Sequence, residues 1–246
     1  MTKIFKYELK IILLKPYVFI MTVITLLYAY FKLSSETIMG VSDTAPFSGW
    51  SFGDYMGDVN LISMLVTLFI MATLFSKQQK KVSILTDVTG FPVRSRMLIR
   101  NVIIGGFFIL NNLLIFILGC AFLGALFGVI YPAVYMADWI LITIPSLLVI
   151  LGVGNLLGKI NPVLIYVFMA VVIAMSFVMR EYAIDINGAN YYTIVSAALE
   201  TLKGGETPFT ITPGFIYTRL FYLILGAGAL ALVSVKTGEK SKKDIL

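Results

Sequence analysis

Side chains that could do chemistry concentrate in one basic segment, residues 77–101. Its only acid is Asp87, and its cations are Lys77, Lys80, Lys81, Arg94, Arg96 and Arg100. Positive charge held between two apolar stretches is typical of a cytoplasmic loop of a membrane protein. The chemistry that this segment offers is attraction of anionic groups and docking to another surface.

The middle of the segment has an apolar edge. Its apolar residues recur at three- and four-residue intervals: Val82, Ile84, Leu85 and Val88. Gly90 and Pro92 follow, and both residue types commonly end a helix. The pattern predicts a short helix outside the membrane, with one side free to contact a partner.

Three amides lie inside apolar stretches, namely Asn111, Asn112 and Asn155. Adjacent residues of a helix point about 100° apart, so at least one of Asn111 and Asn112 must face another helix or a wet cavity. Two roles are open for these amides, hydrogen bonds between helices or contact with a substrate. All three are therefore candidate residues of a substrate pathway.

Catalysis by this chain is not expected. The chain has no histidine, which removes the usual general base and the neutral nitrogen ligand for metals. Its single cysteine, Cys120, lies in an apolar run and cannot form a disulfide within the chain. Residues 152–160, GVGNLLGKI, resemble a phosphate-binding loop, but the spacing is wrong and Ile160 replaces the Ser or Thr that holds magnesium. The sequence predicts no enzyme activity and no cofactor or metal site in this chain.

The elements that must position these residues are apolar. The 246 residues are 59% hydrophobic and 13% charged, which is about half the charge of an ordinary soluble domain. We therefore expect an all-α, polytopic membrane protein with a single domain, residues 1–246. The net charge of +6 comes from short loops beside apolar stretches, so membrane lipid explains it better than nucleic acid.

Hydropathy predicts six transmembrane helices, preceded by an interfacial helix at residues 1–15 in which lysines alternate with apolar residues. The six expected spans cover residues 17–33, 59–76, 102–130, 139–158, 162–179 and 215–235. Residues 34–58 and 180–218 would form outer loops, the second with a helix at 190–202, and residues 131–138 would form a short outer turn. Aromatic residues of the first loop, such as Phe52 and Tyr55, would form an interfacial belt or grip a ligand.

Charge distribution orients this arrangement. The parts expected in the cytoplasm hold 15 of the 19 Lys and Arg residues, and the outer parts hold the remaining 4. This bias follows the positive-inside rule and places both termini in the cytoplasm. Hardly any ionisable residue falls in the middle of an expected span, which disfavours an ion-coupled carrier.

The whole pattern resembles the permease subunits of type-2 ATP-binding cassette (ABC) exporters. The resemblance rests on the interfacial helix, the six spans and the segment VSILTDVTGFPVRSRMLIR after the second span. In that family a run of leucines is followed by Pro-Val or Pro-Ile and a basic residue. Leu85, Val88, Pro92, Val93 and Arg94 match this pattern, whereas Lys80 and Lys81 stand where the family often has an acid.

The resemblance implies a role for the basic segment, which we name the coupling segment (residues 77–101). In such permeases a short cytoplasmic helix docks in a groove of a separate ABC ATPase subunit, which binds ATP and Mg. The residues expected at this contact or in the turn after it are Val82, Ile84, Leu85, Asp87, Val88, Gly90, Pro92 and Arg94. A second permease copy, identical or different, would complete a dimer with a pathway between the copies.

We therefore expect a multi-pass permease of a bacterial plasma membrane, similar to those of peptide-antibiotic export and immunity systems. Its substrate would be an amphipathic or hydrophobic peptide, lipid or drug. Alternatives are a membrane immunity protein that binds a toxin without a motor and, less favoured, an ion-coupled carrier. In these alternatives the coupling segment would be a basic loop whose charge only reflects its position on the cytoplasmic side.

Overall fold

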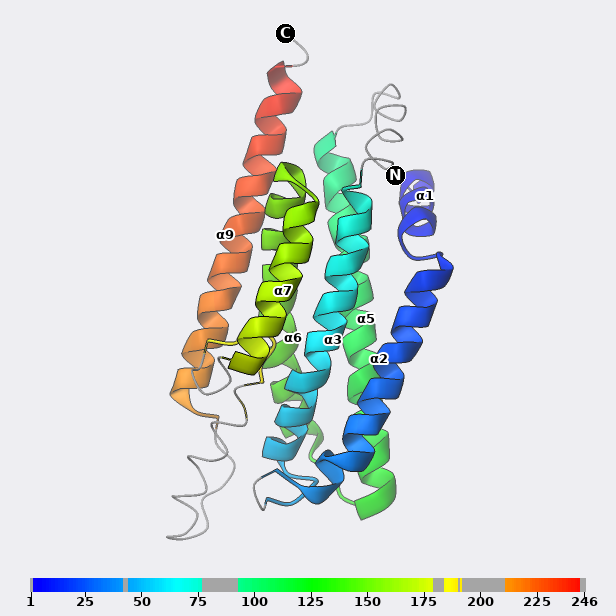
Figure 1. Cartoon of the computed structure of the whole chain (residues 1–246), viewed down its shortest axis with the longest axis vertical. Helices are drawn as coiled ribbons and strands as arrows, with labels where there is room; N and C mark the ends of the chain where they lie inside the picture. Colours follow the sequence, from blue (N-terminus) through cyan, green and yellow to red (C-terminus); the bar gives the residue numbers. More distant parts are fainter. Residues whose placement is uncertain are drawn as a thin grey trace.

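A computed structural model describes residues 2–41, 44–76, 93–178, 184–189, 191 and 211–243, and within these ranges the chain is helical with no strand. Its helices are α1 (Thr2–Ile12), α2 (Pro16–Ser35), a 3-10 turn η1 (Thr37–Met39), α3 (Gly49–Leu74), α5 (Val93–Phe127), α6 (Pro132–Ile160), α7 (Val163–Val178) and α9 (Pro213–Lys243). The long helices lie side by side in one bundle (Figure 1). Helix α1 and the C-terminal end of α9 lie at the same end of this bundle, which we call the α1 end.

Five helices of this bundle are long and apolar enough to cross a membrane. They cover Pro16–Met39, Gly49–Leu74, Ser95–Phe127, Pro132–Ile160 and Pro213–Val235. The chain is thus a multi-pass membrane protein, and five of the six expected spans are confirmed as apolar helices. The remaining one, α7, has 16 described residues, about 24 Å of helix against a hydrocarbon core of about 30 Å. A sixth crossing stays a prediction, as does the interfacial position of α1.

Helices α3 and α6 form the centre of the bundle. Most of α3 is buried, and it contacts α2, α5, α6 and α7. Helix α2 and the spanning part of α9 lie at opposite edges and expose many apolar side chains, as lipid-facing helices do. Because lipid is as apolar as these side chains, close van der Waals packing and hydrogen bonds must hold the helices together.

The backbones of α6 and α9 touch, which explains why this pair packs most closely. A Cβ added at Gly226 would lie 2.4 Å from the carbonyl carbon of Leu148, and one at Gly152 would lie 2.4 Å from the Gly226 oxygen. Only glycine allows this approach, in the manner of small-residue contacts between membrane helices.

Three helices begin earlier than the sequence predicts. Helix α3 starts at Gly49, ten residues inside the expected outer loop 34–58, with Ser48 capping its first turn by accepting from the Ser51 N–H at 3.2 Å. Helix α5 starts at Val93, so the last nine residues of the coupling segment are helical. Helix α6 starts at Pro132, in what was expected to be an outer turn.

The expected aromatic belt is wrong for Phe52 and Tyr55. Both are fully buried between helices, where the Phe52 ring stacks on Tyr135 with centroids 4.1 Å apart. The Tyr55 hydroxyl donates to the Ile115 carbonyl at 2.9 Å. The early start of α3 turns these side chains into the bundle, where they form part of an aromatic core at the end opposite α1.

Candidate functional site

Most of the expected coupling residues lie outside the described part of the chain, and so does the side chain of Arg94. The undescribed ones are Val82, Ile84, Leu85, Asp87, Val88, Gly90 and Pro92. What the structure does describe is the two helices that the segment joins. Helix α3 ends at Leu74 and helix α5 begins at Val93, both at the α1 end. The coupling segment therefore connects two neighbouring helices of the bundle.

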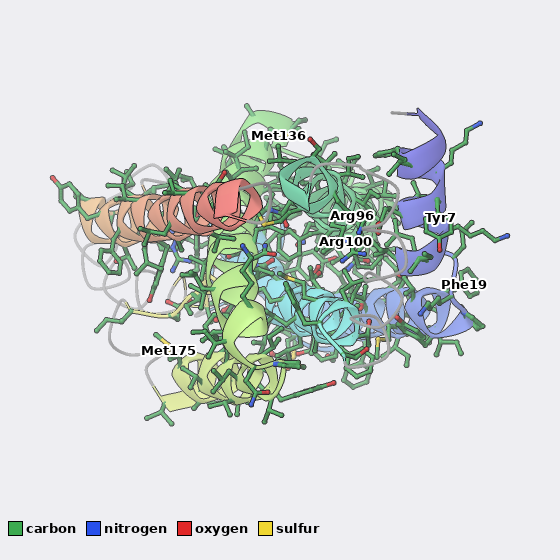
Figure 2. All side chains as sticks on the ribbon, turned by 90° about the horizontal axis from the view of Figure 1, so that it is seen from above. Tyr7, Phe19, Arg96, Arg100, Met136 and Met175 are labelled. Carbon is green, nitrogen blue, oxygen red and sulfur yellow. The ribbon has the colours of Figure 1, made fainter. Side chains whose placement is uncertain are left out.

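A buried ion pair fastens α1 to the start of α5. Arg100 donates to Glu8 twice, from Nε to Oε2 at 2.8 Å and from Nη2 to Oε1 at 3.2 Å. Arg96 approaches the same carboxylate, with its Nε 3.8 Å from Oε1. Seen from the α1 end, both arginines lie among α1, α3 and α5 (Figure 2). We call these three residues the Glu8 clasp.

The clasp gives two basic residues of the coupling segment a structural partner. Glu8 is 3% exposed, and Arg96 is also buried. A bidentate arginine–carboxylate pair fixes both position and orientation. Two arginines of the coupling segment therefore hold the N-terminal helix against α5.

A basic pocket of about 150 Å³ lies beside the clasp, between the ends of α3, α5 and α6. Its cations are Arg96, Arg100 and Lys159, and Lys159 also donates to the Val233 carbonyl of α9 at 3.1 Å. The rest of its lining comprises Leu74, Phe75, Met97, Asn101, Ile104 and Asn155. The described lining therefore brings three cations together beside the Glu8 carboxylate.

Asn155, a candidate pathway residue, lines this pocket. Its amide donates to Asn101 Oδ1 at 2.9 Å and to the Leu151 carbonyl at 2.6 Å. The first of these bonds joins α6 to α5. Asn155 is 3% exposed, so its contacts are those of a residue between helices.

Asn111 and Asn112 meet one hydroxyl group on α3. Their amide nitrogens donate to Ser63 Oγ at 3.0 and 2.9 Å, and Asn112 also donates to the Phe108 carbonyl. Both residues are buried within this chain. The structure thus brings Asn111 and Asn112 together and places Asn155 elsewhere, near the α1 end. Their role in a pathway stays a prediction.

A polar network that the sequence did not predict extends from the middle of α6 toward the end opposite α1. Residues 184–189 lie between helices, and the Asn187 amide donates to the Gly57 carbonyl at 3.1 Å and to Ser176 Oγ at 3.2 Å. Asn60 donates to Ser146 Oγ and to the Asn187 carbonyl, both at 3.0 Å. Part of the expected outer loop 180–218 is therefore buried in the bundle.

Buried charges near this end were also missed. Lys32 of α2 is 5% exposed and lies 2.6 Å from the Asp58 carboxylate, 3.7 Å from that of Asp54 and in contact with Glu36. Arg219 of α9 donates to the Asp185 and Ile186 carbonyls at 2.6 and 2.9 Å. Arg219 and Asp185 lie beside Ile186, whose carbonyl also accepts from Ser146 Oγ in the middle of α6, so these two charges reach deep into the bundle.

Asp138 is the most isolated of these groups. It is completely buried in α6 and accepts a hydrogen bond from the Tyr191 hydroxyl. Burial raises the pKa of Tyr191 well above its usual value, so the phenol stays protonated and keeps donating. Asp138 was expected in an outer turn, and only the start of α6 at Pro132 places it inside.

One signal could have revealed the clasp. Glu8 is the only acid among the first fifteen residues, and Arg96 and Arg100 are spaced to share one helix face. In the part of the chain that the structure describes, no group of three or more His, Cys, Asp or Glu side chains could hold a metal ion.

Comparisons with protein-family models, with curated proteins and with solved structures give no match for this chain.

Proposed function

We propose that this chain is the permease subunit of an ATP-driven exporter of the type-2 ABC kind. A separate ATPase subunit, binding ATP and Mg, would dock on the coupling segment. The observation that carries this proposal is the Glu8 clasp, whose two arginines belong to that segment. The clasp ties α1 to the segment's C-terminal end, which is the start of α5.

The bundle offers a route for motion from the segment to the membrane. The segment is continuous with α3 at one end and α5 at the other, and α3 contacts four other helices. A push on the segment would therefore act on the centre of the bundle and, through the clasp, on α1. Rigid helices that shift against one another are a common means of transmitting such changes.

The cargo of such a permease would be an amphipathic or hydrophobic peptide, lipid or drug. The buried charges Lys32, Asp58, Arg219 and Asp185 are paired within the chain, which suits a substrate without a compact ionic charge better than a small ion. A second permease copy would supply the other wall of the pathway. Asn111, Asn112 and Asn155 remain its candidate polar groups.

The test is isolation of the chain from native membranes. We expect an ATP-hydrolysing subunit to accompany the wild type and to be lost from the double variant Leu85→Asp with Val88→Asp, because two charges would disrupt an apolar contact. Ser83→Asp is the matched control, since it adds one of the same charges away from the apolar edge. Absence of an ATPase from the wild-type preparation, with full activity in the double variant, would refute the proposal.

One rival is a membrane immunity protein that binds a toxin at its outer surface without a motor. It predicts protection that survives both loss of the ATPase gene and the Leu85→Asp, Val88→Asp variant. The expected topology has its own test, in a Cys120→Ala background. Ser42→Cys and Ser196→Cys should react with an impermeant thiol reagent from outside, whereas Ser83→Cys should not.

The second rival, an ion-coupled carrier, gains support from Asp138. A buried carboxyl hydrogen-bonded to a tyrosine is a group through which transport can be coupled to protons. This carrier predicts transport that depends on an ion gradient, persists after ATP depletion and is abolished by Asp138→Asn. The exporter predicts dependence on ATP instead.

A further inference from the structure

The basic pocket beside the Glu8 clasp has the chemistry of an anion site. Arg96, Arg100 and Lys159 bring three cations to a space of about 150 Å³, and Asn101 and Asn155 add amide groups to its wall. Glu8 is the carboxylate that the two arginines contact. An anion with oxygen acceptors, such as a phosphate group, suits this set of donors.

An apolar groove begins where the pocket ends. The groove has a volume of about 510 Å³, and Met97 and Asn101 line both spaces. It is built by α5, α9 and one residue of α6, and its wall on α5 includes Leu98, Val102, Gly106 and Ile109. A Cβ added at Gly106 would meet no atom within 4 Å, so this wall of the groove is open.

We propose that the pocket and the groove together bind one anionic phospholipid of the leaflet at the α1 end. The phosphate lies among Arg96, Arg100 and Lys159, and one acyl chain follows the groove along α5 toward the middle of the membrane. If the termini are cytoplasmic, this is the inner leaflet, where anionic lipids are attracted to basic residues.

The dimensions agree with a lipid. From Asn101 to Ile109 the groove follows α5 for about 12 Å, and one leaflet contributes about 15 Å of hydrocarbon. Leu98 and Val102 are exposed on its rim, as residues in contact with acyl chains are. Free phosphate would explain the basic pocket but not the apolar continuation. A second copy of the chain would fill the groove without supplying an anion.

Such a lipid would connect helices that the clasp does not join. The clasp joins α1 to α5, whereas the lipid would touch α5, α6 and α9 through Lys159 and the groove. The bound phosphate would also lie against the two arginines that hold Glu8. This places the lipid where it can stabilise the start of α5.

The experiment is lipid titration of the full purified chain, read by native mass spectrometry. The probes are phosphatidylglycerol and phosphatidylcholine with identical acyl chains. We expect the wild type to bind phosphatidylglycerol at least fivefold more tightly. Lys159→Gln should weaken phosphatidylglycerol about fivefold, the usual effect of one cation, and leave phosphatidylcholine unchanged. Gly106→Leu should weaken both lipids, because its side chain fills the groove.

Two variants serve as controls. Lys10→Gln removes an exposed charge of α1 outside the pocket, and Ala121→Leu adds bulk to a separate apolar groove between α2 and α5. Both should bind phosphatidylglycerol as the wild type does. If Lys10→Gln weakens binding as much as Lys159→Gln, the lipid is attracted by general surface charge and not by the proposed site.

Three other results would overturn the proposal. One is equal affinity of the wild type for the two lipids. Another is displacement of phosphatidylglycerol by millimolar inorganic phosphate together with normal binding by Gly106→Leu, which would indicate a free-anion site. The third is loss of a dimer in Gly106→Leu, which would make the groove an interface between copies. No ATPase is present in this assay, so its outcome is independent of the exporter proposal.

Discussion

Replacing Glu8 with glutamine tests whether the clasp stabilises the chain. The change keeps the shape of the side chain but removes the charge that two arginines share. Breaking a buried ion pair costs about 3 to 5 kcal/mol. Here the Arg100 side chain is 24% exposed, and the glutamine oxygen can still accept one bond, so we expect a loss of about 2 to 3 kcal/mol.

The assay is a double-mutant cycle with Arg100→Gln, measuring the free energy of unfolding by denaturant titration in mixed micelles. The two changes should not add, and the coupling energy should be about 2 kcal/mol. Glu36→Gln is the matched control, because its carboxylate contacts Lys32 but is 66% exposed. We expect Glu36→Gln to cost less than about 1 kcal/mol.

Two results would contradict a stabilising role for the clasp. One is a coupling energy between Glu8 and Arg100 below about 0.5 kcal/mol, and the other is a loss of stability in Glu36→Gln as large as that in Glu8→Gln. Either result would mean that the pair is solvated in the membrane-bound chain. The clasp could then not carry motion from α5 to α1.

Three further predictions concern the described helices and use the same unfolding measurement. Ser63→Ala removes the acceptor that two buried asparagine amides share and should cost about 1 to 3 kcal/mol, whereas Ser34→Ala at an exposed site should cost under about 0.5 kcal/mol. Gly226→Leu would collide with the backbone of α6 and should cost about 3 kcal/mol or more, whereas Gly228→Leu meets open space, and equal effects would contradict the close packing. Because burial raises the pKa of Tyr191, the folded state retains its proton longer than the unfolded state, so stability must fall as the pH rises above about 10. Tyr191→Phe should make this fall less steep, and an unchanged slope would contradict the buried position of the phenol.

Hydropathy alone was enough to predict the five long apolar helices, but not the residues at which they begin. Residues 49–58 contain Gly, Ser and Asp, and these residue types led to the prediction of an outer loop. They are helical in the structure because Lys32 pairs with Asp58 and lies near Asp54, while Phe52 and Tyr55 pack inside the bundle. The start of α5 was missed for a related reason, since its arginines were assigned to a loop although they lie on a helix that extends past the apolar stretch.

The contacts of the site could be predicted only in part from the sequence, because they join residues far apart in the chain. Glu8 and Arg100 are 92 positions apart, and no local pattern states that one will meet the other. The asparagines show the opposite case. The cost of an amide in lipid predicts that at least one of Asn111 and Asn112 faces another helix or a wet cavity, and the structure shows that both donate to Ser63 of α3.

The structure changes the interpretation of the acidic residues of the chain. The sequence placed Asp54, Asp58, Asp138 and Asp185 in outer loops, where they would only report topology. The structure buries most of these carboxylates, with Lys32, Tyr191 and Arg219 as their neighbours. Ion coupling was disfavoured because the expected spans hold hardly any charge, and these buried carboxylates weaken that reason.

The measurement that tests the central claim most directly is site-specific photo-crosslinking from position 85 in native membranes. A photoreactive residue in place of Leu85 should crosslink to a chain that binds ATP, and the same residue in place of Ser83 should do so much less. Crosslinks from position 85 to lipid alone, or to no nucleotide-binding chain, would contradict the assignment of residues 77–101 as the place where an ATPase couples to this permease.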